Sequence, residues 1–460
     1  MKRSAFLFLS LTIFISIPIG NLNAQSSISA TFASEAEALI KASVENELGW
    51  ERLTYLGDYY GPRLSGSQTL ENAIDWVVEE MKKDGFDRVW TQPVTVPHWV
   101  RGKESATLNI PVERNLPMLG LGGSIGTPHE GITAEVLVVK SFDELQERSD
   151  EVEGKIVLFN AEFTTYGQTV SYRVNGAAEA AKHGAVASMI ASVASYSMQT
   201  PHTGVMRYQE GIPKIPHAAI TVEDALLMQR FADRGETLEV TLKMEAENLP
   251  DTQSRNVIAE IKGSEFPDEI IVLGGHIDSW DVGAGMMDDG GGCVAAWEAL
   301  RLIKKLGLTP KRTIRVVLWT NEENGLAGAN EYKRWVEEDE KSLDNHILAM
   351  ESDAGVFDPI GFGFSGSDEA FEILTAMGLP LKEIESGEVS RGGGGADIGP
   401  LMRAGVPGMG LRVNGEQYFW YHHTDADTID KLNIDDFNEC IATMAIFAYG
   451  TAQLEERLPR

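Results

Sequence analysis

Apolar residues in the first part of the chain recur at helical spacing. Residues 33–60 have the pattern of a helical region, and residues 74–81 place their large apolar side chains on one face of a second helix. Gly85 ends that helix, and residues 89–96 then alternate between apolar and polar in the manner of a strand. This part of the chain therefore predicts helices followed by a strand.

The pattern changes between residues 111 and 247. Short apolar runs such as residues 134–139 and 155–159 are separated by Gly and Pro, with one helical segment over residues 175–183. No group of charged residues with catalytic spacing occurs in this block. We therefore predict that residues 111–247 form a separate, inserted, β-rich module that supplies no metal ligand.

Strand-like and helix-like segments alternate from residue 254 onward. Helix-like segments cover residues 293–306 and 434–454, and the strand-like runs are residues 256–261, 270–273, 313–319, 347–350 and 409–411. This alternation predicts an α/β fold with a doubly wound, mostly parallel sheet and helices on both faces. Residues 25–110 and 248–460 would together build this domain, with the module at 111–247 inserted between them.

The first 24 residues differ from the rest of the chain. Lys2 and Arg3 precede an apolar run over residues 5–19, and small or polar residues lead to Ala24, which is the pattern of a cleaved signal peptide. The run is short for a membrane span, which disfavours an uncleaved anchor. We therefore expect residues 1–24 to be a signal peptide and the protein to be exported, either periplasmic or secreted.

Composition narrows the range of partners. The chain has 460 residues, is 43% hydrophobic and carries a formal net charge of −30. Such acidity argues against nucleic acid, and against a membrane surface after signal cleavage, as partners. Cys293 and Cys440 lie in apolar, helix-like segments, so we expect buried free thiols. The sequence leaves open whether the chain forms a homodimer.

Candidate metal ligands stand where predicted strands end. His276, the pair Glu322 and Glu323, and Asp353 each follow one of three strand-like runs, and Asp288 lies in the loop after the first. Each residue alone has an ordinary structural explanation. In doubly wound sheets, however, the ends of these strands meet at one edge, where ligands bind. Carboxylates and a histidine gathered there would repel one another or be desolvated without a cation, so their combination indicates a metal site.

Several segments in this order resemble the co-catalytic zinc aminopeptidases of clan MH. The segments that carry the resemblance are 276–279, 287–291, 322–325, 351–355 and His423 before the Asp427–Thr428 pair. Segments 61–67, 280–283 and 418–420 extend it to nearly the whole mature chain. The resemblance implies the zinc exopeptidase fold, with residues 111–247 as an inserted protease-associated domain. It also implies a cis peptide between Asp288 and Asp289.

The resemblance implies two Zn2+ ions per chain and a role for each ligand. His276 and Asp353 would bind one ion, Glu323 and His423 would bind the other, and Asp288 would bridge them. One histidine and one carboxylate per ion plus a shared carboxylate is a suitable donor set for paired zinc.

Four further residues receive candidate roles. Glu322 would be the general base, and the Asp278 side chain would accept the second N–H of the His276 imidazole. His422 stands where some relatives have a tyrosine that helps the oxyanion, so its role is open between oxyanion stabilisation and packing. Arg391 precedes a glycine run that we expect to form a mobile loop at the pocket rim, and it is a candidate clamp for a substrate carboxylate.

The function implied by the resemblance is a zinc-dependent exopeptidase that hydrolyses dipeptides or short peptides at a terminus. Which terminus is read stays open. Two alternatives share the fold: a glutaminyl-cyclase-like acyltransferase, which lacks the inserted module, and a binding protein without catalysis. The complete ligand set and Glu322 argue against the second of these.

Overall fold

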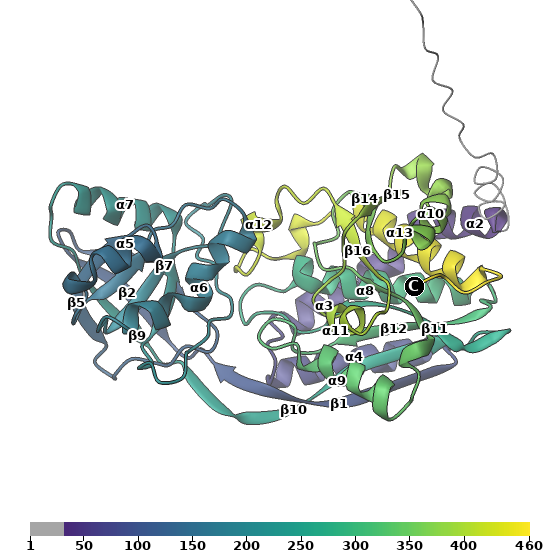
Figure 1. The fold of residues 1–460 in the computed structure, drawn as a ribbon, viewed down its shortest axis with the longest axis horizontal. Coiled ribbons are helices and arrows are strands. Elements are labelled where there is room, and N and C mark those ends of the chain that lie inside the picture. Colours follow the sequence, from purple (N-terminus) through teal and green to yellow (C-terminus); the bar gives the residue numbers. More distant parts are fainter. Residues whose placement is uncertain (1–31) are drawn as a thin grey trace, which may run out of the picture.

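The computed structural model describes residues 32–460, which form two lobes, each built around its own β-sheet (Figure 1). The predicted signal peptide at residues 1–24 lies outside the described residues and stays a prediction. Among residues 32–460, none of the helices combines the length and apolar character needed to cross a membrane.

The first sheet has eight strands and is mixed rather than mostly parallel. Its order is β1 (Arg88–Val100), β10 (Glu247–Ile261), β12 (Arg312–Trp319), β11 (Phe266–His276), β13 (His346–Glu351), β16 (Gly408–Val413), β14 (Pro359–Ser365) and β15 (Glu388–Arg391). Strands β12, β11, β13 and β16 are parallel, whereas β1, β10 and β14 run antiparallel to their inner neighbours. Only four residues, 262–265, separate β10 from β11, too few for the crossover that a parallel pair requires.

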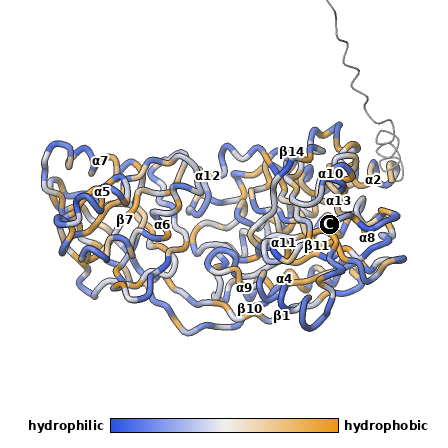
Figure 2. The backbone as a smooth tube through the Cα atoms, viewed as in Figure 1, coloured by the Kyte–Doolittle hydropathy of each residue, from blue (hydrophilic) through white to orange (hydrophobic). Residues whose placement is uncertain are grey.

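Helices cover both faces of this sheet, as the alternating pattern predicted. Ile271 and Leu273 point into the large core under α8 (Gly291–Lys305) and α13 (Ile434–Gln453), whereas Val272 between them packs towards α9 (Ala327–Glu338). Successive side chains of a strand face opposite sides, so a strand buried on both faces is a continuous apolar run. Figure 2 shows such hydrophobic stretches in the interior, including β11. The remaining helices of this lobe are α2 (Ala33–Val44), α3 (Glu47–Tyr60), α4 (Gln68–Lys83), α10 (Asp368–Met377), α11 (Gly399–Arg403) and α12 (Tyr418–Tyr421).

The second sheet forms the inserted lobe. Its order is β3 (Arg114–Leu116), β2 (Glu104–Ile110), β9 (Glu239–Met244), β5 (Ile132–Val139), β6 (Ile156–Phe159), β7 (Ala187–Ala191), β8 (His217–Ile220) and β4 (Met118–Gly120). Strands β5 to β8 are parallel, and the lobe also contains α5 (Phe142–Glu147), α6 (Tyr166–Ala181) and α7 (Val222–Asp233). The lobe is therefore itself a mixed α/β unit.

The predicted start of the inserted lobe, residue 111, is too late. Strand β2 at Glu104–Ile110 pairs with β9 of the inserted lobe, so the lobe begins near residue 104. The sequence did not reveal this boundary, because β2 follows directly after β1 along the chain. Only its pairing with the distant β9 assigns β2 to the second sheet. The lobe is carried on β1 and β10, which form a long antiparallel ribbon leading into it and back (Figure 1).

Candidate metal centre

The sequence-predicted ligands lie together at one edge of the first sheet. His276 is the last residue of β11, Glu322 and Glu323 follow β12, and Asp353 follows β13. These three strands are adjacent and parallel, so their carboxyl ends meet at the same edge. This is the edge where doubly wound sheets bind ligands.

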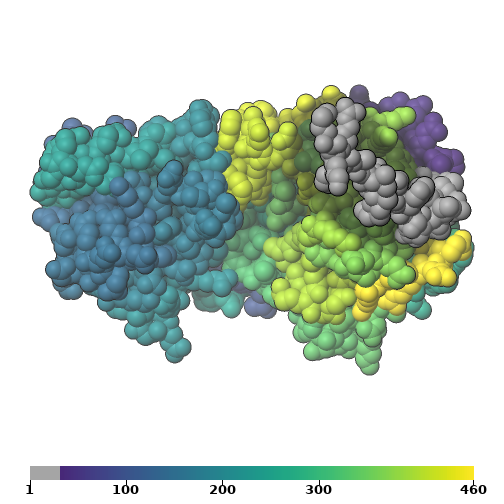
Figure 3. Space-filling model, turned by 45° about the horizontal axis from the view of Figure 1, so that its top comes forward, coloured from purple at the N-terminus to yellow at the C-terminus, as the bar shows by residue number. Residues whose placement is uncertain are grey.

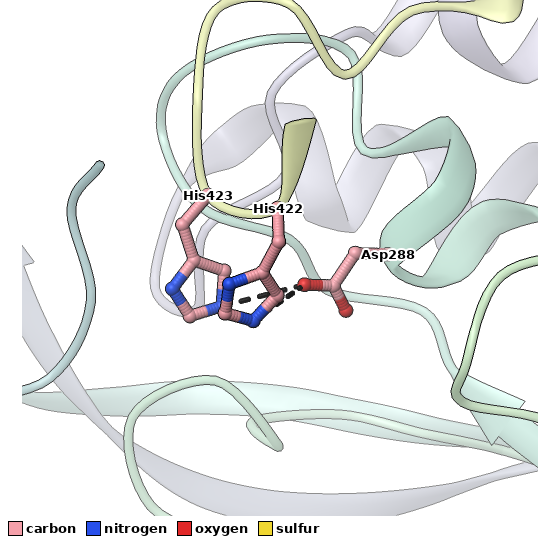
Figure 4. Close-up of side chains that lie close together, drawn as sticks. All are labelled: Asp288, His422 and His423. Atoms are coloured by element: carbon pink, nitrogen blue, oxygen red, sulfur yellow. Dashed lines mark ion pairs between the residues drawn. The ribbon is translucent and has the colours of Figure 1, made fainter. Parts of the chain in front are cut away.

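Two groups of side chains with metal-ligand spacing form there, and they share Asp288. In the first group, His276 Nε2 lies 3.2 Å from Asp288 Oδ1 and 3.5 Å from Asp353 Oδ1. In the second, Asp288 Oδ2 lies 3.3 Å from His423 Nε2 and 3.5 Å from His422 Nε2. Figure 4 shows both imidazoles directed at the Asp288 carboxylate.

Glu323 completes the second group. Its Oε2 lies 3.0 Å from His423 Nε2, the same nitrogen that faces Asp288. All five sequence-predicted ligands are therefore brought together, with Asp288 between the two groups. His422 joins them as a sixth side chain; its ring stacks on that of His423 at a centroid distance of 3.5 Å.

Unsatisfied atoms in these groups fit a cation. His276 Nε2, Asp288 Oδ2 and Glu323 Oε1 are buried, and no hydrogen bond satisfies them. A buried polar atom without a partner costs roughly 1–3 kcal/mol, so native proteins keep few of them. Three such atoms on three candidate ligands, from three segments of the chain, have the donor chemistry that a bound metal ion would satisfy.

The charges and pKa values of the site also indicate a bound cation. Burial, reinforced by the Asp288 carboxylate, raises the pKa of Glu323 to about 7. Burial by itself lowers the pKa of His423, but Glu323 and Asp288 outweigh it and raise that pKa to about 9. Acidic groups outnumber cationic ones in a space shielded from water, and a divalent cation would supply the missing positive charge.

Buried residues outside the ligand set hold the Asp288 loop in place. Asp427 accepts hydrogen bonds from the backbone N–H groups of Met286, Met287 and Asp288 at 3.1, 2.7 and 3.2 Å. Asp289 accepts the His276 N–H at 3.1 Å, and the expected cis peptide joins it to Asp288. The sequence marked Asp427 and Asp289 only as motif positions and did not reveal these contacts.

Arg63 supports the same loop from the other side. Its buried guanidinium donates to the carbonyl groups of Ile277, Ala284 and Gly285 at 2.9, 2.7 and 2.9 Å. It also donates to the Gly61 carbonyl at 2.8 Å. The motif around residues 61–67 was the only sequence signal for this role.

A cavity of about 400 Å³ opens onto the metal-binding groups. Glu322 lines it together with the ligands Asp288, Glu323, Asp353 and His423. The opposite wall belongs to the inserted lobe, which contributes Tyr166, Arg173, Val205 and Arg207. The inserted lobe supplies none of the side chains in the two groups, but it does line the cavity, which no pattern in the sequence indicated.

Comparisons with known proteins decide the family. The family model described as peptidase family M28 matches residues 256–448. Carboxypeptidase Q from Homo sapiens is 48% identical over 434 residues, covering 94% of this chain and 91% of that protein. Carboxypeptidase Q from Rattus norvegicus is 46% identical, and the match covers 100% of both chains. The chain belongs to peptidase family M28.

Solved structures agree with this assignment. The crystal structure of a peptidase M28 precursor from Shewanella amazonensis is 36% identical and has a TM-score of 0.88, covering 95% of this chain and 99% of that one. A zinc aminopeptidase from Bacillus subtilis shares the fold at 20% identity, with a TM-score of 0.67 and coverage of 89% and 98%.

This M28 metallopeptidase is thus an exopeptidase homologous to carboxypeptidase Q along nearly its whole length. Membership in the family implies zinc. A peptidase match of this extent favours hydrolysis over the cyclase-like and binding alternatives.

In this M28 peptidase, the backbone carbonyl of Asp278, and not its side chain as predicted, contacts the His276 imidazole. His276 Nδ1 lies 2.9 Å from the backbone carbonyl of Asp278, whereas the nearest oxygen of its carboxylate is 3.8 Å away. That carboxylate instead accepts the Glu322 N–H and the Ser65 hydroxyl, each at 3.1 Å. The backbone turn after β11 returns the carbonyl to the imidazole, which leaves the Asp278 side chain free to hold the Glu322 segment.

The structure places Arg391 away from the cavity, which does not support its expected role as a carboxylate clamp. Arg391 ends the edge strand β15, pairs with Asp368 at 2.6 Å and lies over the Phe371 ring, outside the residues that line the cavity. The glycine run that follows is closely packed rather than loose. A Cβ on Gly393 would lie 2.3 Å from the backbone of Gly363, so close approach of two chain segments explains the glycine at this position.

Proposed function

We propose that this M28 peptidase is a two-zinc exopeptidase that cleaves dipeptides with free termini. The observation that carries this proposal is the opposite charge of the two walls of the cavity. Acidic metal-binding groups form one wall, and two arginines of the inserted lobe, Arg173 and Arg207, form part of the other. A dipeptide carries one charge of each sign at opposite ends, which matches this arrangement.

The donor set supports two zinc ions with the roles that the family resemblance implies. His276 and Asp353 would hold one ion, Glu323 and His423 the other, and Asp288 both, which matches the two observed groups. When bound, such a pair lowers the pKa of a coordinated water and polarises the scissile carbonyl.

Glu322 suits the role of general base. Asp278 holds its backbone N–H, while its side chain reaches the cavity next to both groups. Burial, together with the carboxylates of Asp353 and Glu323, raises the pKa of Glu322 well above its usual range. A carboxylate of raised pKa in this place can take a proton from the attacking water and pass it to the leaving amine.

Arg173 suits the role of carboxylate reader. Its guanidinium is buried, its Nη2 donates to the Tyr166 hydroxyl at 2.8 Å, and its Nε has no hydrogen-bond partner. No carboxylate within residues 32–460 forms an ion pair with it. A buried guanidinium without a counter-ion binds an incoming carboxylate strongly, because charge-assisted hydrogen bonds contribute about 1.5–3 kcal/mol each.

The test compares a dipeptide with its C-terminal amide in wild type and Arg173→Met. Loss of one charge-assisted contact should lower kcat/KM for the free dipeptide about 10–150-fold, by the magnitude above. The amide, which lacks the charge, should be affected much less. Arg230→Met on the outer helix α7 serves as a control for the loss of positive charge. Equal losses on both substrates would contradict carboxylate reading, and a wild type that prefers the amide would contradict the proposal for free dipeptides.

We further propose that the inserted lobe is a protease-associated domain and that the chain is exported. The position of the lobe between β1 and β10 and its resemblance to such domains support the first part. The basic and apolar N-terminal pattern supports the second. Mass spectrometry of the protein purified from its natural host should find a mature N-terminus near Gln25; retention of Met1–Ala24 would contradict export by this signal.

A further inference from the structure

We infer that the inserted lobe contributes to one of the two metal sites, because its residues His202 and Thr203 position the ligand His423. This inference rests on the proposed role of His423 as a zinc ligand. His202 and Thr203 lie on the loop between β7 and β8. They are positioning residues, and neither is among the proposed zinc ligands.

Three hydrogen bonds join this loop to the ligand segment. The Thr203 N–H donates to the His423 carbonyl at 3.0 Å, and His423 Nδ1 donates to the Thr203 carbonyl at 3.2 Å. His202 Nδ1 donates to the His422 carbonyl at 2.7 Å. All three cross between the lobes. In Figures 1 and 3, the yellow segment that carries α12 lies against the blue and teal inserted lobe.

The bond to Thr203 favours the tautomer of His423 that is protonated on Nδ1, because a carbonyl oxygen can only accept, and this tautomer has its lone pair on Nε2. Arg173 Nη1, which can only donate, lies 3.4 Å from the same nitrogen, farther than the 3.2 Å to the Thr203 carbonyl. Nε2 is the atom that faces Asp288 and Glu323. A partner that fixes the far nitrogen of a ligand histidine typically changes metal affinity about 10–100-fold when it is lost.

The backbone of His423 needs this support. Its φ is +62°, in the left-handed region that costs a residue with a Cβ about 1–2 kcal/mol. The pair of hydrogen bonds between residues 203 and 423 holds this conformation. His202 supports the preceding peptide in the same way, because its Nδ1 donates to the His422 carbonyl at 2.7 Å.

The supporting loop is itself rigidly held. Within the inserted lobe, the His202 N–H donates to Ser192 Oγ at 2.9 Å, and Thr203 Oγ1 donates to the Gly120 carbonyl at 2.8 Å. Trp280 of the first lobe packs so tightly on Gly122 that a Cβ there would lie 2.1 Å from its ring. The Trp280 ring in turn lies 5.6 Å from the His423 ring. The loop that contains His202 and Thr203 is therefore held firmly enough to fix the position of the His423 segment.

The other metal-binding group does not depend on the inserted lobe. The far nitrogen of His276 is held by the Asp278 carbonyl within the first lobe. Disturbing the loop should therefore weaken one zinc ion and spare the other. A general loss of stability would weaken both together.

The experiment measures zinc stoichiometry and stepwise affinity by chelator competition on the full chain. His202→Ala removes the donor to the His422 carbonyl, and His202→Asn keeps a donor on the same branch of the side chain. His217→Ala is the matched control: His217 is a buried, neutral histidine of the same lobe that bonds Ser188 instead. Cobalt-loaded samples give an absorption spectrum as a second readout.

We expect His202→Ala to lower the affinity for one of the two ions about 10–100-fold and to change the cobalt spectrum. His202→Asn should restore most of both, and His217→Ala should keep wild-type affinities even if its stability falls. Wild-type affinity for both ions in His202→Ala would overturn the inference, as would equal weakening in His217→Ala. A wild type that binds a single ion would instead refute the two-zinc proposal itself.

Discussion

Replacing Glu322 with glutamine separates proton transfer from metal binding. Glutamine keeps the size and polarity of the side chain but cannot accept a proton at neutral pH. Within residues 32–460, the Glu322 carboxylate takes part in no hydrogen bond, and the contact to Asp278 is made by the backbone N–H at 3.1 Å. The substitution therefore breaks no contact that holds the fold.

The expected loss is large and confined to turnover. General acid–base catalysis contributes about 10²–10⁴-fold, equivalent to roughly 2.7–5.4 kcal/mol of transition-state stabilisation. Glu322→Gln should lower kcat on a dipeptide by at least that factor, while the zinc content and the unfolding midpoint stay near those of wild type.

Glu323→Gln is the matched comparison because it changes the adjacent carboxylate in the same way. Glu323 Oε2 lies 3.0 Å from His423 Nε2 and Oε1 is unsatisfied, so this variant should lose zinc along with activity. Steady-state kinetics on the zinc-loaded proteins and metal analysis after gel filtration check both variants. Near-normal hydrolysis by Glu322→Gln, or zinc loss equal to that of Glu323→Gln, would refute the assignment of the two carboxylates.

Three further outcomes are expected. Asp288→Ala should lower occupancy at both metal positions together, because its oxygens face both groups; metal analysis that finds one full site would contradict this. Burial lowers the pKa of His217 and of His346 to about 4, so each stabilises the fold fully above its unfolded pKa of about 6.5. As the pH falls from 6.5 towards 4, denaturation curves should show the free energy of unfolding decreasing by about 1.4 kcal/mol per pH unit for each of the two histidines. The decrease should be less steep in His217→Asn. Arg63→Lys should cost at least about 2 kcal/mol in chemical denaturation, because lysine cannot reach all four carbonyl groups that Arg63 bonds; an unchanged midpoint would show that the clamp is unimportant.

Part of the metal site could be predicted from local rules in the sequence. His276, Glu323 and Asp353 lie at or just after strand-like apolar runs, and parallel strands bring their carboxyl ends to one edge. The place of His423 in the ligand set came from the family resemblance. The helix-covered sheet follows from the same alternation. Cys293 and Cys440 are buried free thiols, as their apolar surroundings predicted.

Other features were decided only by contacts between distant segments. Strand β2 belongs to the inserted lobe because it pairs with β9, more than a hundred residues away, and Arg391 leaves the cavity because Asp368 and Phe371 hold it elsewhere. Arg173 has no motif around it and matters only because α6 packs against the ligand segment. Local patterns specify which faces are buried, whereas the pairing of strands and the docking of one lobe on another depend on side chains that meet only after folding. For this reason the ligands were visible in the sequence, and the wall that faces them, with its support for His423, was visible only in the tertiary structure.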